Sequence, residues 1–394
     1  MLNKIAFSQL GRRYQYKYAE ILHTENLLEK LYTDFWFPFD VKQKVSSKVV
    51  KTMIERRNSN IPNNLVKAYN AMGVQLSIEL RKCKDIYEIS ELLVKFGKLF
   101  GEKQLKSTIS ESVIGMCSES LEIFSRYKEN NKHTILIQYD SANDEDVFLD
   151  EQSKFPSWKA SVFNRAESYY ERVYKEWELS EKIIVNSLWA KEMIVKQGAS
   201  GGKIEIVPLI HDENSFAIDE KPVNSLNPLK VLYVGSIVLR KGVQYLLEAT
   251  TKLPKANFEF YMVGSSILSH ETLRSMYPNV TFYEHVPFSE VEKFYKQCDV
   301  FVFPSLSDGF GSVQVEAMSY GMPVIATTSC GDVVEHQVSG YLVPPNNSVE
   351  IVKHLEFLCN NRDFLQLMKV NAKKRSLDFT IENLSKKFIN IVTV

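Results

Sequence analysis

The sequence predicts an α/β protein made of two doubly wound domains, each with a parallel β-sheet covered by helices. A chain of 394 residues is too long for one hydrophobic core and favours two domains of similar size. Short apolar runs alternate with helical patterns in both halves, which is the rhythm of a parallel sheet with crossover helices. The stretch from Val300 to Ala326 supports the same class, because it has the pattern of a strand, a glycine loop, a helix and a second strand.

Residues 1–212 are expected to form the first domain. A first strand is predicted over residues 2–7, followed by a turn that contains Gly11 and by a helix from about Tyr14 to Leu31. Residues 40–105 have a loosely periodic helical pattern and are predicted to be a helical insertion. Further strands are expected at Ser112–Met116, Thr134–Gln138, Ile183–Asn186 and Ile204–Pro208.

The second domain is expected to cover residues 229–378. A polar segment that contains proline, residues 213–228, is the predicted linker, and residues 379–394 form a final amphipathic helix. The strands of the second domain are predicted at Leu229–Val234, Phe258–Val263, Val280–Tyr283, Val300–Phe303 and Val324–Ala326.

Composition excludes several classes of protein. Lys plus Arg and Asp plus Glu number 48 each, so the net charge of zero gives no reason to expect nucleic acid as a partner. The five cysteines are scattered and form no Cys-x-x-Cys pair, which argues against a disulfide framework and a zinc site. No apolar run approaches the length of a membrane span, and Met1 leads into a strand without a signal-peptide profile, so we expect a cytoplasmic location.

A basic stretch at residues 41–60 has two interpretations. Its six cations are opposed by Glu55 alone, and this imbalance suits peripheral contact with a membrane or with an anionic, lipid-linked acceptor. The alternative is an ordinary solvated face, which the lack of Trp and Phe on its apolar side favours.

The loop Asp308–Gly311 is the strongest candidate for a ligand site. It follows a predicted buried strand, and the helix that begins at Ser312 directs its free N–H groups at the crevice, where an anion fits. Asp308 and Glu316 are carboxylates beside that point, and a carboxylate suits a ligand that also carries hydroxyl groups. A sugar nucleotide has both a diphosphate and hydroxyls. The alternative is that both acids are ordinary polar residues of an α/β unit.

The whole stretch from Cys298 to Pro345 resembles the retaining glycosyltransferases of family 4. It carries their acid, seven residues and Glu around a Gly-Phe-Gly turn, followed by Glu-Ala-Met, Gly-x-Pro-Val-Ile-Ala and Gly-Tyr-Leu-Val-Pro. The resemblance implies the GT-B fold, in which two Rossmann-like domains face a central cleft and the C-terminal helix returns to the first domain. It also implies a nucleotide-sugar donor, UDP- or GDP-linked, a saccharide or lipid-linked acceptor, and no metal or other cofactor. By family association, the acceptor belongs to cell-surface polysaccharide or lipopolysaccharide synthesis, at the inner face of the membrane.

The resemblance also assigns residues. Asp308, which stands where most members have Glu, contacts the transferred sugar, and Glu316 holds the ribose. Lys241 matches a Lys that grips the diphosphate, and Arg240 is expected to replace the Arg whose usual position is taken by Ser236. The expected catalytic residues are Asp140, Arg240, Lys241 and Asp308. The expected donor-binding residues are Gly11, Gly235, Ser236, Val286, Gly309, Phe310, Gly311, Ser312, Val313 and Glu316.

The sequence leaves three alternatives to this function. The acidic run 144–146 has the Asp-x-Asp spacing of metal-dependent glycosyltransferases, but it opens a helical region instead of ending a strand, so an exposed helix start is favoured. The same scaffold also suits a sugar-nucleotide epimerase or a phosphorylase. A non-catalytic subunit is the third alternative, because Ser236 and Asp308 depart from the family pattern.

Overall fold

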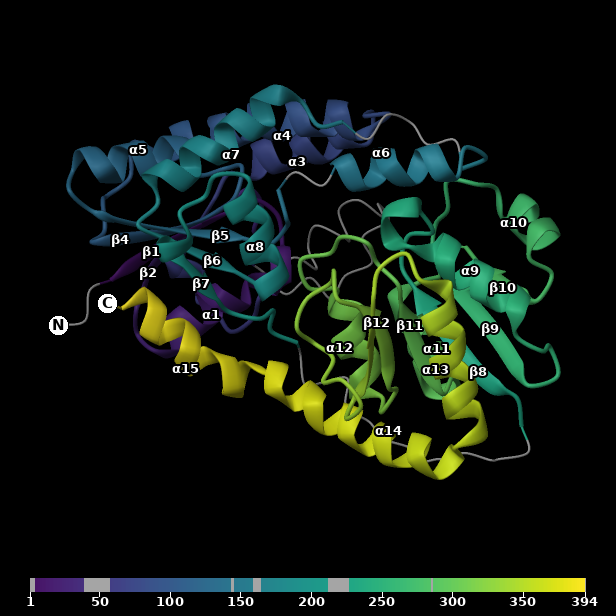
Figure 1. The fold of residues 1–394 in the computed structure, drawn as a ribbon. Coiled ribbons are helices and arrows are strands. Elements are labelled where there is room, and N and C mark those ends of the chain that lie inside the picture. The colour runs from purple at the N-terminus through teal and green to yellow at the C-terminus, as the bar shows by residue number, and fades with distance from the viewer. Residues whose placement is uncertain are drawn as a thin grey trace.

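The computed structural model describes residues 4–38, 57–142, 145–158, 164–211, 227–284 and 286–393. The predicted fold class is confirmed: two parallel sheets, each covered by helices, form two Rossmann-like domains that lie side by side (Figure 1). Most of the basic stretch 41–60, most of the linker 213–228, and Asp144 lie outside the described residues.

The N-terminal sheet has the order β3-β2-β1-β4-β5-β6-β7, and all its pairs are parallel. Its strands are β1 (Ile5–Gln9), β2 (Leu28–Thr33), β3 (Val66–Ala68), β4 (Ser112–Met116), β5 (His133–Gln138), β6 (Lys182–Val185) and β7 (Ile204–Ile206). Strands β1 and β4 are buried along their whole length, as expected for central strands of a parallel sheet. Because β5 and β6 are parallel, their carboxyl ends lie at the same edge of the sheet. The residues that directly follow these two strands are therefore close together.

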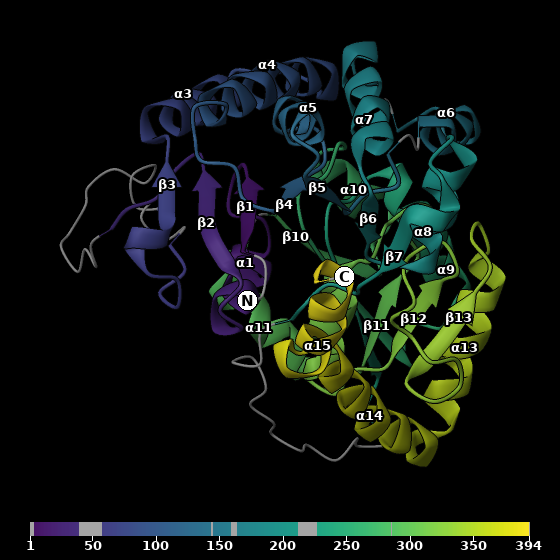
Figure 2. The ribbon, with the colours of Figure 1, turned by 90° about the vertical axis from the view of Figure 1, so that its left-hand side faces the viewer.

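Helices cover both faces of this sheet (Figure 2). They are α1 (Lys17–Thr24), α3 (Asn70–Leu80), α4 (Ile86–Gln104), α5 (Leu121–Glu129), α7 (Glu167–Leu179) and α8 (Leu188–Lys196), with short 3-10 turns η1 (Arg13–Tyr16), η2 (Asn63–Leu65) and η3 (Gly201–Lys203). The start of α4 is fixed by Asp85, whose side chain accepts a hydrogen bond of 2.9 Å from the Glu88 amide. Ser187 starts α8 in the same way, with a bond of 3.0 Å from Ala190 N.

Two predictions for the first domain are wrong. The helix expected from Tyr14 to Leu31 ends at Thr24, and the chain reverses through Asn26, which has a left-handed φ of 55°, into strand β2. The region 40–105 is not a purely helical insertion, because it contains β3, the edge strand, and α3 and α4 then cross to β4.

The C-terminal sheet has the order β10-β9-β8-β11-β12-β13. Its strands are β8 (Leu229–Val234), β9 (Phe258–Val263), β10 (Val280–Tyr283), β11 (Val300–Phe303), β12 (Val324–Thr327) and β13 (Gly340–Val343). The helices are α9 (Val243–Lys252), α10 (His270–Met276), α11 (Phe288–Gln297), α12 (Ser312–Ser319), α13 (Ser348–Asn360) and α14 (Arg362–Ser376), with turns η5 (Leu239–Lys241) and η6 (Leu377–Phe379). All the predicted strands of this domain are present, and β13 is an additional one.

Each domain also receives a helix from the other half of the chain. Helix α15 (Ile381–Val392) lies against α1 of the N-terminal domain, where Phe388 is fully buried and its ring lies 4.8 Å from that of Tyr18 (Figure 1). Helix α6 (Glu145–Lys154) begins at the acidic run, as predicted, and packs against η5 and α9 of the C-terminal domain. No helix in the described part of the chain is long and apolar enough to cross a membrane.

Candidate active site between the two domains

A cavity of about 220 Å³ lies between the domains at the carboxyl ends of their strands. The N-terminal domain lines it with Tyr14, Tyr139, Asn186 and Leu209. The C-terminal domain lines it with Val234, Gly235, Lys241, Phe303, Asp308, Phe310, Gly311, Ser312 and Val313. The edge where the strands of a doubly wound sheet end is the usual ligand site of such folds.

The loop after β11 directs the start of α12 at this cavity. Gly311 has a left-handed φ of 68°, and a Cβ on it would overlap the ring of Phe303, so the turn requires glycine. Asp308 closes the loop: its amide donates to Ser329 O at 3.1 Å, and its carboxylate accepts from the Phe310 amide at 3.3 Å. The first residues of α12 consequently border the cavity, as predicted for an anion site.

Lys241 and Asp308 form an ion pair within the cavity wall. Their side chains are 17% and 18% exposed, and the Lys241 ammonium also lies 5.5 Å from the centre of the Phe303 ring. Burial alone would raise the pKa of Asp308, but the charge and hydrogen bond of Lys241, with the nearby charge of Arg240, outweigh it. The pKa of Asp308 therefore lies below its ordinary value, and this carboxylate is ionised near neutral pH.

The turn η5 positions Lys241. Lys241 N donates to Val238 O at 3.0 Å, and the turn ends at Gly242, which has a left-handed φ of 64°. A Cβ on Gly242 would overlap the carbonyl oxygen of Pro304, so the turn packs directly on the loop after β11. Arg240 does not line the cavity; its guanidinium Nη1 donates to Ser307 O at 2.6 Å. This bond indicates that Arg240 stabilises the backbone of the loop that carries Asp308.

The N-terminal domain contributes four residues that the sequence did not predict as site residues: Tyr14, Tyr139, Asn186 and Leu209. The rings of Tyr14 and Tyr139 lie 4.4 Å apart, and Asn186 Nδ2 donates to Tyr139 O at 2.7 Å. Burial, together with the charge of Asp308, raises the pKa of Tyr14 to about 12, so its hydroxyl is a neutral hydrogen-bond donor. Tyr139 directly follows β5 and Asn186 directly follows β6, so the rule that ligands bind at strand ends could have identified both.

Gly309 lies directly against the N-terminal domain. A Cβ on Gly309 would overlap the carbonyl oxygen of Tyr139 and would lie 3.0 Å from Asn186 Oδ1. The glycine is therefore required for the closeness of the loop after β11 to the N-terminal domain, and not for an unusual dihedral angle.

Five predicted donor-binding residues lie outside the lining of this cavity. They are Gly309, which lies against Tyr139 and Asn186, and Gly11, Ser236, Val286 and Glu316. Glu316 lies further along α12 and accepts a hydrogen bond of 3.0 Å from Tyr295 Oη. Burial raises the pKa of Glu316, and the hydrogen bonds from Tyr295 and Ser312 oppose that effect. Of the others, Gly11 donates its amide to Asp34 at 2.8 Å, the Ser236 carbonyl accepts from Tyr233 Oη at 2.7 Å, and Val286 packs against the core.

Asp140 lines a neighbouring cavity of about 500 Å³, so it is separated from Lys241 and Asp308. The residues around this second cavity are Arg13, Tyr14, Ile86, Ile89, Ser90, Leu93, Cys117, Tyr139, Asp140, Arg165 and Tyr169. Tyr14 and Tyr139 line both cavities, so the two cavities adjoin at these side chains. One side of the second cavity is an apolar surface of α4, and the other carries the carboxylate of Asp140, which accepts from Ala142 N at 3.1 Å.

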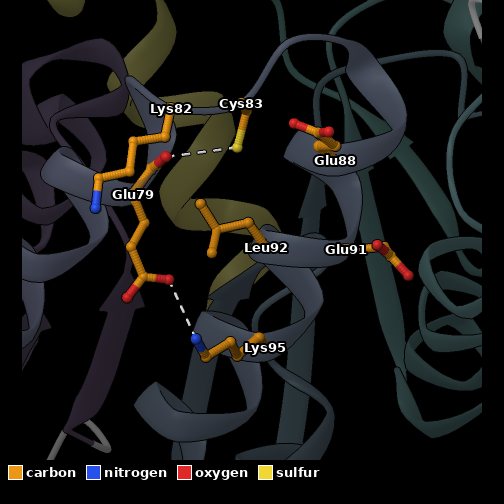
Figure 3. A pocket seen from close by; sticks show the side chains of 7 residues that line it. All are labelled: Glu79, Lys82, Cys83, Glu88, Glu91, Leu92 and Lys95. Atoms are coloured by element: carbon orange, nitrogen blue, oxygen red, sulfur yellow. Dashed lines mark hydrogen bonds and ion pairs between the residues drawn. The ribbon is translucent and has the colours of Figure 1, made fainter.

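A third hollow, of about 510 Å³, lies apart from these two on α3, α4 and the turn between them (Figure 3). Its charged side chains include the pair of Lys95 and Glu79, whose Nζ and Oε2 atoms are 3.1 Å apart. Cys83 donates to the Glu79 carbonyl at 3.5 Å. Because it shares no residue with the other two cavities, this hollow is not part of the candidate site.

The comparisons with known proteins assign a family to the C-terminal domain. Residues 214–375 match the family model described as Glycosyl transferases group 1. The chain therefore carries a group 1 glycosyltransferase domain in a GT-B fold. The matched region includes Lys241, Asp308 and the whole of α12.

Two curated relatives illustrate the match. The chain is 31% identical over 209 residues to the capsular polysaccharide biosynthesis glycosyltransferase CapM of Staphylococcus aureus, covering 50% of this chain and 54% of that protein. It is 30% identical over 180 residues to the glycogen synthase of Thermodesulfovibrio yellowstonii, covering 43% and 35%. The chain spans about half the length, or less, of the curated relatives it matches.

Two solved structures share the fold over nearly the full chain. HepE from Anabaena, in complex with UDP-glucose, has a TM-score of 0.64 at 15% identity and covers 99% of each chain. Sucrose-phosphate synthase from Thermosynechococcus elongatus has a TM-score of 0.64 at 17% identity and covers 99% of this chain and 98% of its own. At such identities the likeness establishes the fold alone.

Proposed function

We propose that the protein is a retaining glycosyltransferase, which moves a sugar from a UDP- or GDP-sugar to a saccharide or lipid-linked acceptor. The proposal depends on one observation: Lys241, Asp308 and the start of α12 line the same cavity between the domains. A cation and free helix amides suit a diphosphate, and a buried, ionised carboxylate suits sugar hydroxyls. The likeness to capsular polysaccharide and amylovoran biosynthesis glycosyltransferases supports an acceptor in cell-surface polysaccharide or lipopolysaccharide synthesis.

On the donor side, the ion pair of Lys241 and Asp308 must open as the donor enters. Lys241 then turns to the diphosphate, and Asp308 accepts hydrogen bonds from the transferred sugar. As the bond between the anomeric carbon and the diphosphate breaks, its electron pair stays on the leaving oxygen, and Lys241 with the amides of Ser312 and Val313 stabilises the added charge. Glu316, further along α12, is proposed to hold the ribose hydroxyls.

We propose that the acceptor binds in the larger cavity, the acceptor-side cavity, which Asp140 lines. The donor binds in the smaller one, the donor cavity. The tyrosine pair Tyr14 and Tyr139 borders both cavities, so an acceptor hydroxyl in the larger one can approach the sugar in the smaller one. The apolar surface of α4 and the aromatic rings suit the faces of sugar rings or the start of a lipid. Asp308 is proposed to bind the sugar hydroxyls and not to act as a covalent nucleophile. The acceptor oxygen then bonds to the anomeric carbon on the face from which the diphosphate leaves, and its proton passes to the leaving diphosphate oxygen.

The test is a panel of UDP-, GDP-, ADP- and CMP-sugars, measured by thermal shift and then by turnover with candidate acceptors. A ligand at a hundred times its dissociation constant adds about 2.7 kcal/mol of stability. The expected result is a shift with the UDP or GDP series, reduced in Glu316→Gln, and a product whose anomeric configuration matches that of the donor. A matched control is Glu335→Gln, which changes the same type of side chain in the same domain but lies outside both cavities.

Other outcomes identify the alternatives. Absence of any shift favours a non-catalytic subunit. Conversion of the donor without an acceptor indicates an epimerase, and turnover that requires inorganic phosphate indicates a phosphorylase.

A further inference from the structure

Helix α6 belongs to the N-terminal domain by sequence but to the C-terminal domain by packing. It follows β5 and precedes α7 and β6, yet it lies over η5 and α9 (Figure 1). Phe155, just beyond its end, meets the ring of Tyr245 edge-on at 5.8 Å, and Trp158 is 1% exposed within the C-terminal core. The segment 145–158 is therefore anchored to the domain that holds the donor side of the site.

The buried carboxylate of Glu151 is the polar centre of this contact. Glu151 is 1% exposed and accepts hydrogen bonds from Gln244 Nε2 at 2.7 Å and from Tyr245 Oη at 2.9 Å. Lys154 Nζ, on the same helix, is 3.0 Å from its other oxygen. A buried carboxylate needs such a full set of donors, so these side chains hold each other in fixed places.

Gln244 extends this network to the turn that carries Lys241. The same Gln244 Nε2 also donates to Leu239 O at 3.1 Å, the first carbonyl of η5. Leu239 O accepts the Gly242 amide at 2.8 Å as well, so the bond from Gln244 is added to the bond that closes the turn. Glu151 orients Gln244, and Gln244 in turn steadies the backbone from which the Lys241 side chain reaches the donor cavity.

The other end of α6 is bonded to the wall of the larger cavity. Glu145 Oε1 accepts from Arg165 N at 2.7 Å and from Tyr170 Oη at 2.6 Å. Arg165 lines that cavity and donates from Nη1 to Ala142 O at 2.6 Å. Helix α6 thus joins the acceptor-side cavity at its start to the Lys241 turn at its middle.

We propose that Glu151 is a positioning residue for the donor site: through Gln244 and Leu239 it holds the turn η5, and with it Lys241, in the orientation that binds the diphosphate. The inference rests on the proposed function and adds to it a residue from the other half of the chain.

The test is a double-mutant cycle on donor affinity, measured by calorimetry with the NDP-sugar that binds the wild type. Glu151→Ala is expected to weaken binding about tenfold in the wild-type background and to have almost no effect in the Lys241→Ala background, because coupled residues are not additive. Asp150→Asn is the matched control: it changes the neighbouring acid on α6, which is 59% exposed and pairs with the same Lys154. Its donor affinity should equal that of the wild type.

A second variant, Gln244→Ala, tests the same link if Glu151→Ala does not fold. Gln244→Ala leaves Glu151 its bonds to Tyr245 and Lys154 and removes the link to Leu239. It should show the same loss of affinity and the same dependence on Lys241, with a smaller fall in thermal midpoint. A purely structural role predicts equal losses in both backgrounds, and that result overturns the inference.

The two levels of the proposal fail differently. If the wild type binds a donor and the Glu151 and Gln244 variants bind it equally well, the positioning role is wrong and the proposed function stands. If the wild type binds no NDP-sugar, the proposed function is wrong and the inference falls with it.

Discussion

Lys241 and Asp308 hold each other in an ion pair at the wall of the interdomain cavity, although the family resemblance assigns them to different parts of the donor. Lys241 comes from the turn after β8, and Asp308 from the loop after β11. Each side chain balances the charge of the other in a largely buried position. The proposed function requires that a diphosphate and a sugar hydroxyl replace the two halves of this pair when the donor binds.

Lys241→Ala should lower turnover by about 10²–10³, the loss typical when one group that stabilises developing negative charge is removed. The effect should be larger on kcat than on donor KM, since the charge on the diphosphate grows as the sugar leaves. Steady-state kinetics with the donor found by the panel provide the measurement. Lys252→Ala is the control, because that Lys is in the same domain and pairs with Glu248 one helical turn away. Turnover of Lys241→Ala within about threefold of the wild type would contradict the proposed role.

The ion pair also predicts how stability depends on pH. The folded-state pKa of Asp308 lies below its unfolded value, so the contribution of this carboxylate to stability is present above the ordinary Asp pKa of about 3.9 and is lost as pH falls through the lower, folded-state pKa. The thermal midpoint of Asp308→Asn should therefore lie below that of the wild type at pH 7, and the gap should narrow below about pH 4.

Thermal denaturation of both proteins from pH 7 down to the acid limit of folding checks this prediction. Asp299→Asn is a useful comparison, because Asp299 pairs with Lys369 at 3.1 Å with similar exposure but lies away from the cavity. A gap between wild type and Asp308→Asn that stays constant across the range would mean that the pair with Lys241 does not lower the pKa of Asp308.

The part of the cavity wall around α12 could be predicted from the sequence because its information is local. The glycine at 311, the helix that begins at Ser312 and the strand before them lie within a dozen residues, and local geometry alone brings them to one edge of the sheet. Lys241 was predicted by resemblance, and the structure brings it to Asp308. The sequence did not predict that Arg240 bonds to the loop after β11. Its partner is the backbone carbonyl of Ser307, and every residue type offers such a carbonyl.

The N-terminal side was harder to predict for two physical reasons. Leu27, Leu28, Leu31 and Tyr32 are spaced like one face of a helix, but burial between β1 and β3 makes their segment a strand. The backbone at Tyr14 and Tyr16 is also left-handed. Tyrosine rarely adopts this conformation, so the sequence does not predict it. Contacts across the domain interface, such as Gly309 on Tyr139, depend on how two separately folded units meet.

Gly309→Ala should separate donor binding from catalysis. The added methyl group would overlap the Tyr139 carbonyl and so push the loop after β11 away from the N-terminal domain. Donor affinity should stay near the wild-type value, because the groups proposed to bind the diphosphate all belong to the C-terminal domain. Turnover should fall by about 10² if the displacement approaches 1 Å.

The measurement is calorimetry for the donor together with kinetics for transfer. Gly202→Ala is the matched control, since no atom lies within 4 Å of a Cβ there and no left-handed dihedral angle is involved. Equal losses of binding and turnover in Gly309→Ala would show that the residue supports the donor loop itself and not the approach of the two domains.

Helix α15 should stabilise the N-terminal domain through Phe388. This side chain is fully buried against Tyr18 of α1, so Phe388→Ala leaves a cavity and should lower the free energy of unfolding by about 3–5 kcal/mol. The nearby bond from Lys182 Nζ to Ile391 O, 2.6 Å long, should weaken with it as the helix loosens. Urea denaturation followed by tryptophan fluorescence measures the change, with Lys387→Ala as the control because this side chain, at the preceding position, is exposed. If Phe388→Ala unfolds at the same urea concentration as Lys387→Ala, α15 is not a structural part of the N-terminal domain, and its return across the domain boundary must serve another purpose.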